Sequence, residues 1–203
     1  MVGLGLGLGL GFGGNQRPAP QPNASNGGPE LLLQAQIISV SDSTAEGSLI
    51  RAAAVPWHEI VAHLKYDPSF LRHFASEPRK FEEFLAASYD RAGFDEVTLT
   101  PQRNDGGRDV IAVKKGFGSI RILEQAKAYS PGHLVTHDDI RAMLGVLSVD
   151  QNSSKGIITT TSDFQPGITK ADSQFAPFMP HRLELKNGEA LLKWLASFDP
   201  AHT

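Results

Sequence analysis

The order of strand-like and helical runs between residues 78 and 199 constrains the fold more than any other feature of this chain. Four runs have the β-branched or alternating composition of strands: residues 95–100, 108–114, 119–128 and 155–161. Gly116 and Gly118 lie between the second and third runs, which predicts a β-hairpin. One helical run precedes this group and another interrupts it, so the segment is predicted to fold as an α/β domain.

Apolar residues at helical spacing mark most of the remaining elements. Helices are predicted over residues 56–64, from residue 67 onward, over 79–92, behind Thr136, over 166–175 and over 189–197, with a short strand over 182–185. Pro78 and Gly93 mark the two ends of the third helix. Thr136 and Asp139 have the spacing of a capping box, with Asp in place of the usual Glu.

Glycine and proline crowd the beginning of the chain. Residues 3–10 alternate Gly with Leu, and several prolines follow before residue 30. Because such a composition is costly to order, residues 1–47 are predicted to be a flexible, disordered leader. The Gly-Leu run is much shorter than the ~20 apolar residues of a membrane-spanning helix, so no stable membrane association is expected. Residues 48–77 are predicted to be an N-terminal helical extension.

Cysteine is absent and the formal net charge is −3. The missing thiols exclude a disulfide framework, a thiol nucleophile and a zinc site built from thiolates, and they are consistent with a cytoplasmic protein. The charge excludes a globally basic nucleic-acid coat. Locally, residues 101–130 hold six Lys and Arg side chains against three acidic ones. This excess suits contacts with phosphates, although a solvated hairpin would have the same composition.

The hairpin also carries the candidate chemistry. Asp109 begins one predicted strand, and Gln125 and Lys127 share a face near the end of its neighbour, because alternate strand residues point the same way. A carboxylate, a second oxygen ligand and a lysine that meet in this way suit metal-assisted phosphodiester hydrolysis. On spacing alone, the competing interpretation is that Asp109 caps a turn and Lys127 is a solvated charge at the end of a strand.

Several short motifs occur here in a characteristic order. They are Arg79-Lys80-Phe81-Glu82-Glu83-Phe84-Leu85, Ala92-Gly93-Phe94, Asp105-Gly106-Gly107-Arg108-Asp109-Val110-Ile111-Ala112, Gln125-Ala126-Lys127, Leu144-Gly145-Val146-Leu147 and Gly156-Ile157-Ile158-Thr159-Thr160-Thr161-Ser162-Asp163-Phe164. Over roughly 120 residues the chain resembles the Mrr-like catalytic domain of type IV restriction endonucleases, a branch of the PD-(D/E)XK nuclease superfamily. The resemblance implies a restriction-endonuclease-like core: a mixed central β-sheet flanked by helices, over residues 78–199.

The resemblance also implies an activity and a site. The protein is expected to be a Mg²⁺-dependent endodeoxyribonuclease of restriction, defence or DNA-processing type, with Mn²⁺ as a substitute ion, DNA as its partner and homodimer formation as an option. Asp109, Gln125 and Glu82 are the implied metal ligands, and Lys127 is the implied catalytic lysine. Gln125 stands where the superfamily usually has an acid, although Mrr-like members use Gln there.

Two alternatives stay open at this point. The missing acid at Gln125 favours a catalytically silent DNA-binding or interaction module on the same fold, because a fold alone does not fix function. The neighbouring carboxylate of Glu124 belongs to the opposite face of the strand by its period, so it is expected to be a salt-bridged or edge charge rather than a metal ligand.

Overall fold

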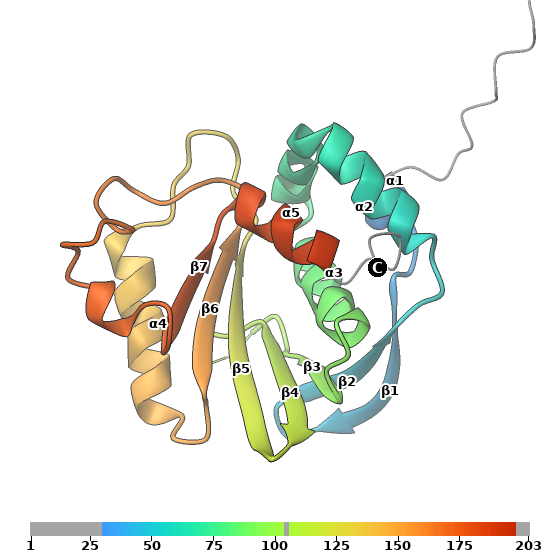
Figure 1. Ribbon diagram of the computed structural model, residues 1–203. Coiled ribbons are helices and arrows are strands. Elements are labelled where there is room, and N and C mark those ends of the chain that lie inside the picture. Colours follow the sequence, from blue (N-terminus) through green and yellow to red (C-terminus); the bar gives the residue numbers. More distant parts are fainter. Residues whose placement is uncertain (1–29, 104–105, 198–203) are drawn as a thin grey trace, which may run out of the picture.

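Seven strands form one mixed sheet, with the order β1-β2-β3-β4-β5-β6-β7, in the computed structural model (Figure 1). The structure describes residues 30–103 and 106–197. The strands are β1 (Ile38–Thr44), β2 (Gly47–Ala52), β3 (Glu96–Leu99), β4 (Val110–Gly116), β5 (Gly118–Lys127), β6 (Lys155–Thr160) and β7 (Leu183–Lys186). Neighbours from β1 to β5 are antiparallel, whereas β6 and β7 run parallel to β5. The predicted mixed α/β sheet is therefore confirmed.

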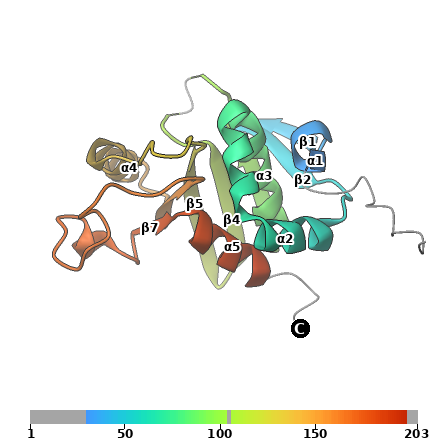
Figure 2. The same cartoon turned by 90° about the horizontal axis from the view of Figure 1, so that it is seen from above.

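Helices cover both faces of this sheet. They are α1 (Glu30–Gln34), α2 (Trp57–Tyr66), α3 (Pro78–Arg91), α4 (His137–Val149) and α5 (Gly188–Ser197), with 3₁₀ segments η1 (Pro68–Ser76) and η2 (Ala176–Phe178). Figure 2 shows α4 on one side of the sheet and α3 and α5 on the other. We call these two sides of the sheet the α4 face and the α3 face.

Successive side chains of the central strands point to opposite faces of the sheet, and each face has its own hydrophobic core. The α3 face buries Val110, Ala112, Ile122 and Ile157, and the α4 face buries Ile111, Leu123 and Ile158. Strands buried on both faces read as continuous apolar runs, and residues 110–113 and 156–158 have this composition. Each core side chain removed from water contributes about 1.5–3 kcal/mol, so the register of β4 and β5 is fixed from both sides.

The segment before α3 belongs to the core of the sheet domain. The Trp57 ring of α2 stacks on Phe84 of α3, with ring centroids 5.4 Å apart. Phe74 of η1 stacks on the same Phe84 ring at 5.5 Å. All three rings are buried against the α3 face, so α2 and η1 are integral to the fold.

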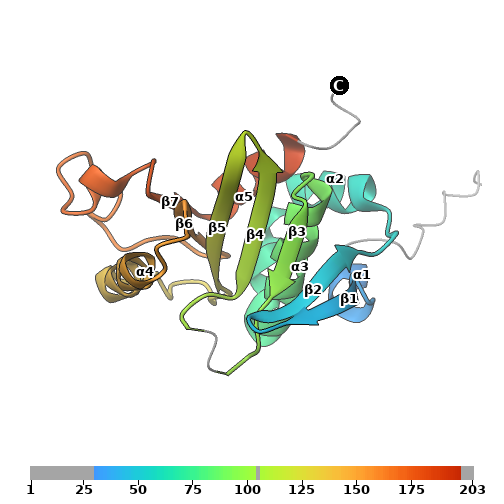
Figure 3. The same ribbon diagram turned by 90° about the horizontal axis from the view of Figure 1, so that it is seen from below.

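Three expectations for individual segments are corrected by the structure. Residues 38–52, assigned to the leader and the start of a helical extension, form the β1–β2 hairpin that extends the sheet beside β3 (Figure 3). Residues 166–175 form turns instead of a helix, and the helix predicted from residue 67 is the 3₁₀ segment η1. Residues 1–29 of the predicted leader lie outside the described residues. Along the described chain, no helix combines the length and apolar character needed to cross a membrane.

Candidate active site

The predicted site residues lie at one edge of the sheet. β4 begins just after Asp109, while its antiparallel neighbours β3 and β5 end at Leu99 and Lys127. β6 runs parallel to β5 and ends at Thr160, opposite Lys127 (Figure 1). Polar groups that follow or end these strands therefore meet at the same edge.

A glycine turn brings the chain into β4 at this edge. Gly106 and Gly107 have φ values of +66° and +78°, a backbone conformation that L side chains rarely adopt. A Cβ atom on Gly107 would also stand 2.9 Å from Cγ2 of Val146 in α4. Glycine is therefore required at these two positions for the backbone conformation of the turn, and at Gly107 also for its close approach to α4.

Backbone and side-chain hydrogen bonds position Asp109. The register partner of Glu124 is Val110, yet the Asp109 N–H also donates to the Glu124 carbonyl at 2.8 Å. The backbone of Asp109 is therefore held beside the end of β5. Oδ2 of Asp109 then accepts the Ala126 N–H at 2.7 Å. Asp109 is thereby fixed against the Gln-Ala-Lys segment, as the sequence predicted.

Gln125 contributes an oxygen that fits a divalent cation. Its Oε1 atom is buried and has no hydrogen-bond partner among residues 30–103 and 106–197. Leaving a buried acceptor unsatisfied costs about 1–3 kcal/mol, so such an atom is a natural ligand. Mg²⁺ is held by carboxylate and amide oxygens, and the carboxylate of Asp109 accepts from the residue next to Gln125. The residues present therefore fit a hard cation between β4 and β5.

Lys127 lies on the α4 face and is paired there. Its Nζ stands 2.9 Å from Oδ1 of Asp139 in the first turn of α4, and both side chains are less than one-fifth exposed. Burial by itself lowers the pKa of Lys127, but the hydrogen bond and charge of Asp139, together with Tyr129, outweigh it. The pKa of Lys127 therefore lies above its ordinary value and the side chain is an ammonium.

The strand end that carries Lys127 is anchored by β6. The Thr160 hydroxyl donates to the Lys127 carbonyl at 2.9 Å, and the Thr161 N–H donates to the same oxygen at 3.2 Å. The Thr161 hydroxyl both accepts from the Tyr129 N–H and donates to the Tyr129 carbonyl. The Thr-Thr motif thus fixes the backbone on both sides of residue 128.

Glu82 approaches this edge from α3. Its Oε2 atom accepts from Nη1 of Arg79 at 2.6 Å, and the same nitrogen donates to the Thr100 carbonyl at 2.9 Å. The backbone N–H of Thr100 in turn donates to the Asp109 carbonyl at 3.0 Å. Arg79 therefore links Glu82 to the strand that pairs with Asp109. A ligand role for Glu82 stays a prediction.

Glu124 is neither an edge charge nor an exposed salt bridge, which corrects the sequence-based expectation. Its side chain lies on the α3 face, is 1% exposed, and accepts a 2.6 Å hydrogen bond from the Tyr89 hydroxyl of α3. Burial raises its pKa to about 7, although Lys186 and Tyr89 act in the opposite direction. Gln125 and Lys127 project from the other face, so the predicted separation of the two faces holds.

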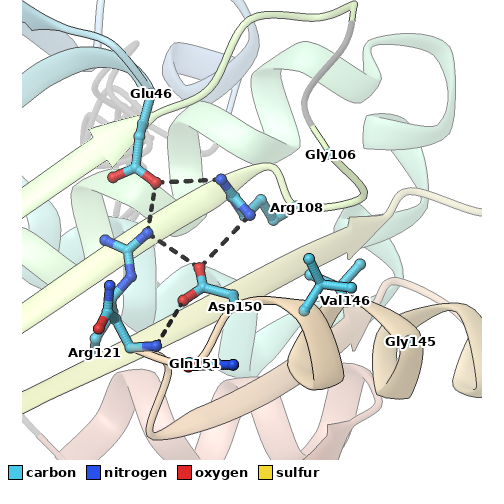
Figure 4. Close-up of a pocket in the computed structure, with 10 residues that line it drawn as sticks. Glu46, Gly106, Arg108, Arg121, Gly145, Val146, Asp150 and Gln151 are labelled. Atoms are coloured by element: carbon cyan, nitrogen blue, oxygen red, sulfur yellow. Dashed lines mark hydrogen bonds and ion pairs between the residues drawn. The ribbon is translucent and has the colours of Figure 1, made fainter.

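The basic excess of the hairpin is compensated by carboxylates from outside it. Arg121 contacts Glu46 at 2.6 Å and Asp150 at 3.3 Å, and Arg108 contacts the same two carboxylates at 3.2 and 3.6 Å (Figure 4). This network lines an open pocket of about 910 Å³ between the β1–β2 turn and the end of α4. Lys114, Lys115 and Lys127 pair with Asp95, Glu96 and Asp139. Counting charges within residues 101–130 therefore overstates the positive field.

Two residues of the site were missed in the sequence. Asp139 was assigned to the capping box alone, and Arg79 was noted only as part of a motif. Asp139 pairs with Lys127, twelve residues away, and Arg79 pairs with Glu82, three residues away. An ion pair between residues as distant as Asp139 and Lys127 leaves no periodic pattern in the sequence. Among residues 30–103 and 106–197, no three His, Asp or Glu side chains converge as a ready-made metal cage.

Comparison with known proteins places this geometry in a family. A family model described as a restriction endonuclease, the Mrr-type catalytic domain, matches residues 75–195, more than half of the chain. The search of curated proteins found no match. Two solved structures are similar: the MspJI restriction endonuclease in complex with a 27-mer oligonucleotide and the DNA modification-dependent restriction endonuclease AspBHI. Both are 17% identical, with TM-scores of 0.43 and 0.47 over 77% and 80% of this chain.

The chain spans only 34% and 39% of the lengths of these two structures. The family assignment therefore rests on the family model, whose matched region begins just before α3 and ends within α5. It contains the glycine turn, the Gln-Ala-Lys segment and the Thr-Thr strand end that build the site. The chain belongs to the restriction endonuclease family with the Mrr-type catalytic domain.

Proposed function

We propose that this protein is a Mg²⁺-dependent DNA endonuclease that hydrolyses phosphodiester bonds at the edge between β4 and β5. The hydrogen bond from Ala126 to Asp109 carries the proposal, because it fixes a carboxylate against the segment that bears Gln125 and Lys127. Mn²⁺ is expected to substitute for Mg²⁺, since both accept oxygen ligands.

Each residue has a distinct role in this proposal. Asp109 and Gln125 would hold the cation, with Glu82 completing the oxygen set from α3. A bound Mg²⁺ would polarise the scissile phosphate and lower the pKa of an attacking water. Lys127, held as an ammonium, would donate to a phosphate oxygen and stabilise the charge that develops there.

The proposed site also bears on the substrate and on the number of protein copies that are needed to cut it. DNA is the proposed substrate, in line with the restriction endonuclease family. One such site cleaves one strand, so cutting both strands together requires two copies, and we propose that a homodimer forms on DNA. The ratio of linear to nicked plasmid should then rise with protein concentration.

The test is cleavage of supercoiled plasmid with Mg²⁺ or Mn²⁺, using methylated and unmethylated DNA in parallel. Nicked or linear product is expected with metal and should disappear with EDTA. Lys127→Ala serves as the control against a contaminating nuclease. The silent-module alternative, favoured by the amide at Gln125, predicts DNA binding without cleavage under every metal condition, and that result would overturn the proposal.

A further inference from the structure

A single carboxylate in α4 joins the candidate lysine to the start of a helix. Oδ1 of Asp139 contacts Lys127 Nζ at 2.9 Å. Oδ2 of the same side chain accepts from the N–H and the hydroxyl of Thr136, both at 2.8 Å. Thr136 is the N-cap of α4 and Asp139 is its N3 residue, so the two form a complete capping box. One oxygen of Asp139 therefore pairs with Lys127, and the other caps the helix through Thr136.

The surroundings leave Lys127 little freedom. The loop between β5 and α4 is tied to the end of β6 at Tyr129, and Val135 pairs with the chain beyond β6. The Tyr129 ring lies 5.9 Å from Lys127 Nζ and stacks on His133 with centroids 3.9 Å apart. An unpaired lysine samples many rotamers, and fixing one costs up to about 2 kcal/mol. Asp139 supplies that restriction before any substrate binds.

We infer that Asp139 is a positioning residue for Lys127 and that the charge of its carboxylate sets the placement of the ammonium. This inference rests on the proposed nuclease function. Asp139 does not touch the phosphate; it acts through Lys127. A misplaced catalytic group can cost about 10²-fold in rate, so removing the pairing should lower kcat and leave KM for DNA nearly unchanged.

The chain offers matched variants for the test. Asp139→Asn keeps an oxygen that can accept from Thr136 but removes the charge that faces Lys127. Asp138→Asn removes the same charge one residue earlier, from a side chain that is 90% exposed and paired with Arg141. Asp139→Glu keeps the charge and places the residue most common at N3 of a capping box. Thr136→Ala weakens the cap and leaves the ion pair.

Plasmid cleavage kinetics and thermal denaturation are measured for all four variants. Asp139→Asn should lower kcat about 10- to 100-fold, while Asp138→Asn and Thr136→Ala stay within about threefold of wild type and Asp139→Glu recovers most of the loss. Equal kcat in Asp139→Asn and wild type would overturn the inference and leave the nuclease proposal standing. An equal fall in Thr136→Ala would also overturn it, because the helix cap alone would then explain the effect.

A second measurement separates this inference from the proposed function. The ¹H–¹⁵N signal of the Lys127 ammonium, identified by its loss in Lys127→Arg, should persist in Asp138→Asn and vanish through fast exchange in Asp139→Asn. Persistence of the signal in Asp139→Asn would overturn the positioning role. A wild-type protein that shows the signal but cuts no DNA would overturn the nuclease proposal alone.

Discussion

The two faces of β5 place neighbouring polar residues in different surroundings. On the α4 face, Gln125 contributes a buried oxygen and Lys127 is held as an ammonium by Asp139. On the α3 face, Glu124 is fully buried against Tyr89 with a pKa of about 7. Strand alternation therefore places the carboxylate of Glu124 in the core and the side chains of Gln125 and Lys127 on the opposite face. These three residues lie within four consecutive positions of β5.

Burial also sets Glu124 apart from the proposed metal site. The charged form of Glu124 is penalised by burial, so this carboxylate is a poor substitute ligand. Two other carboxylates contact the Gln-Ala-Lys segment: Asp109 accepts from the Ala126 N–H, and Asp139 pairs with Lys127.

The largest expected effect is on the α4 face. Lys127→Ala and Asp109→Ala should each lower the cleavage rate at least 10²-fold, equivalent to about 2.7–4 kcal/mol of transition-state stabilisation. Asp109→Ala should also remove the Mg²⁺ signal in calorimetry, whereas Lys127→Ala should keep it. Lys193→Ala, an exposed lysine of α5, is the control. Wild-type rates in either site variant would remove that residue from the mechanism.

The next effect concerns stability on the α3 face. Glu124→Ala removes buried volume and leaves the Tyr89 hydroxyl without its acceptor, so unfolding should become easier by about 2–4 kcal/mol. Denaturant titration measures this loss, with Gln125→Ala as the comparison on the other face. A smaller loss in Glu124→Ala than in Gln125→Ala would contradict the assignment of Glu124 to the core.

A smaller effect is the pH dependence of stability. The pKa of Glu124 is raised from 4.5 to about 7 in the folded protein, so between these values the folded state binds a proton that the unfolded chain has lost. The contribution of this residue is present below about pH 4.5 and is lost as the pH rises through about 7, by at most roughly 3 kcal/mol. Glu124→Gln should flatten the slope of stability between about pH 5 and 8; an unchanged slope would mean that another group titrates.

Much of this arrangement could be predicted from the sequence because apolar periodicity encodes it. The central strands, α3 and the capping box of α4 were predicted from local patterns, and the faces of Gln125 and Lys127 follow from strand alternation. The β1–β2 hairpin was missed since β1 is an exposed edge strand: beyond Ile38 its residues are exposed. The alternation of Ile38 and Val40 with serines is too short to predict a strand by itself.

The remaining differences involve partners that are distant along the chain. The position of Asp109 depends on a hydrogen bond to Glu124, fifteen residues later. The neutralised arginines of the hairpin depend on Glu46 and Asp150, which lie on either side of the counted window. Tertiary contacts of this kind have no local periodicity, so composition over a short segment gives the wrong local charge.

A Mg²⁺ titration of plasmid cleavage determines whether the α4 face of β5 carries the metal site. Gln125→Ala should raise the Mg²⁺ concentration needed for half-maximal cleavage, and Gln125→Glu should preserve or lower it, because a hard cation prefers a carboxylate. Glu124→Gln, which keeps the volume of the buried side chain, should leave the requirement unchanged. If Glu124→Gln loses its response to Mg²⁺ while Gln125→Ala cuts normally, the ligand lies on the α3 face and the assignment of the metal site to the α4 face is wrong.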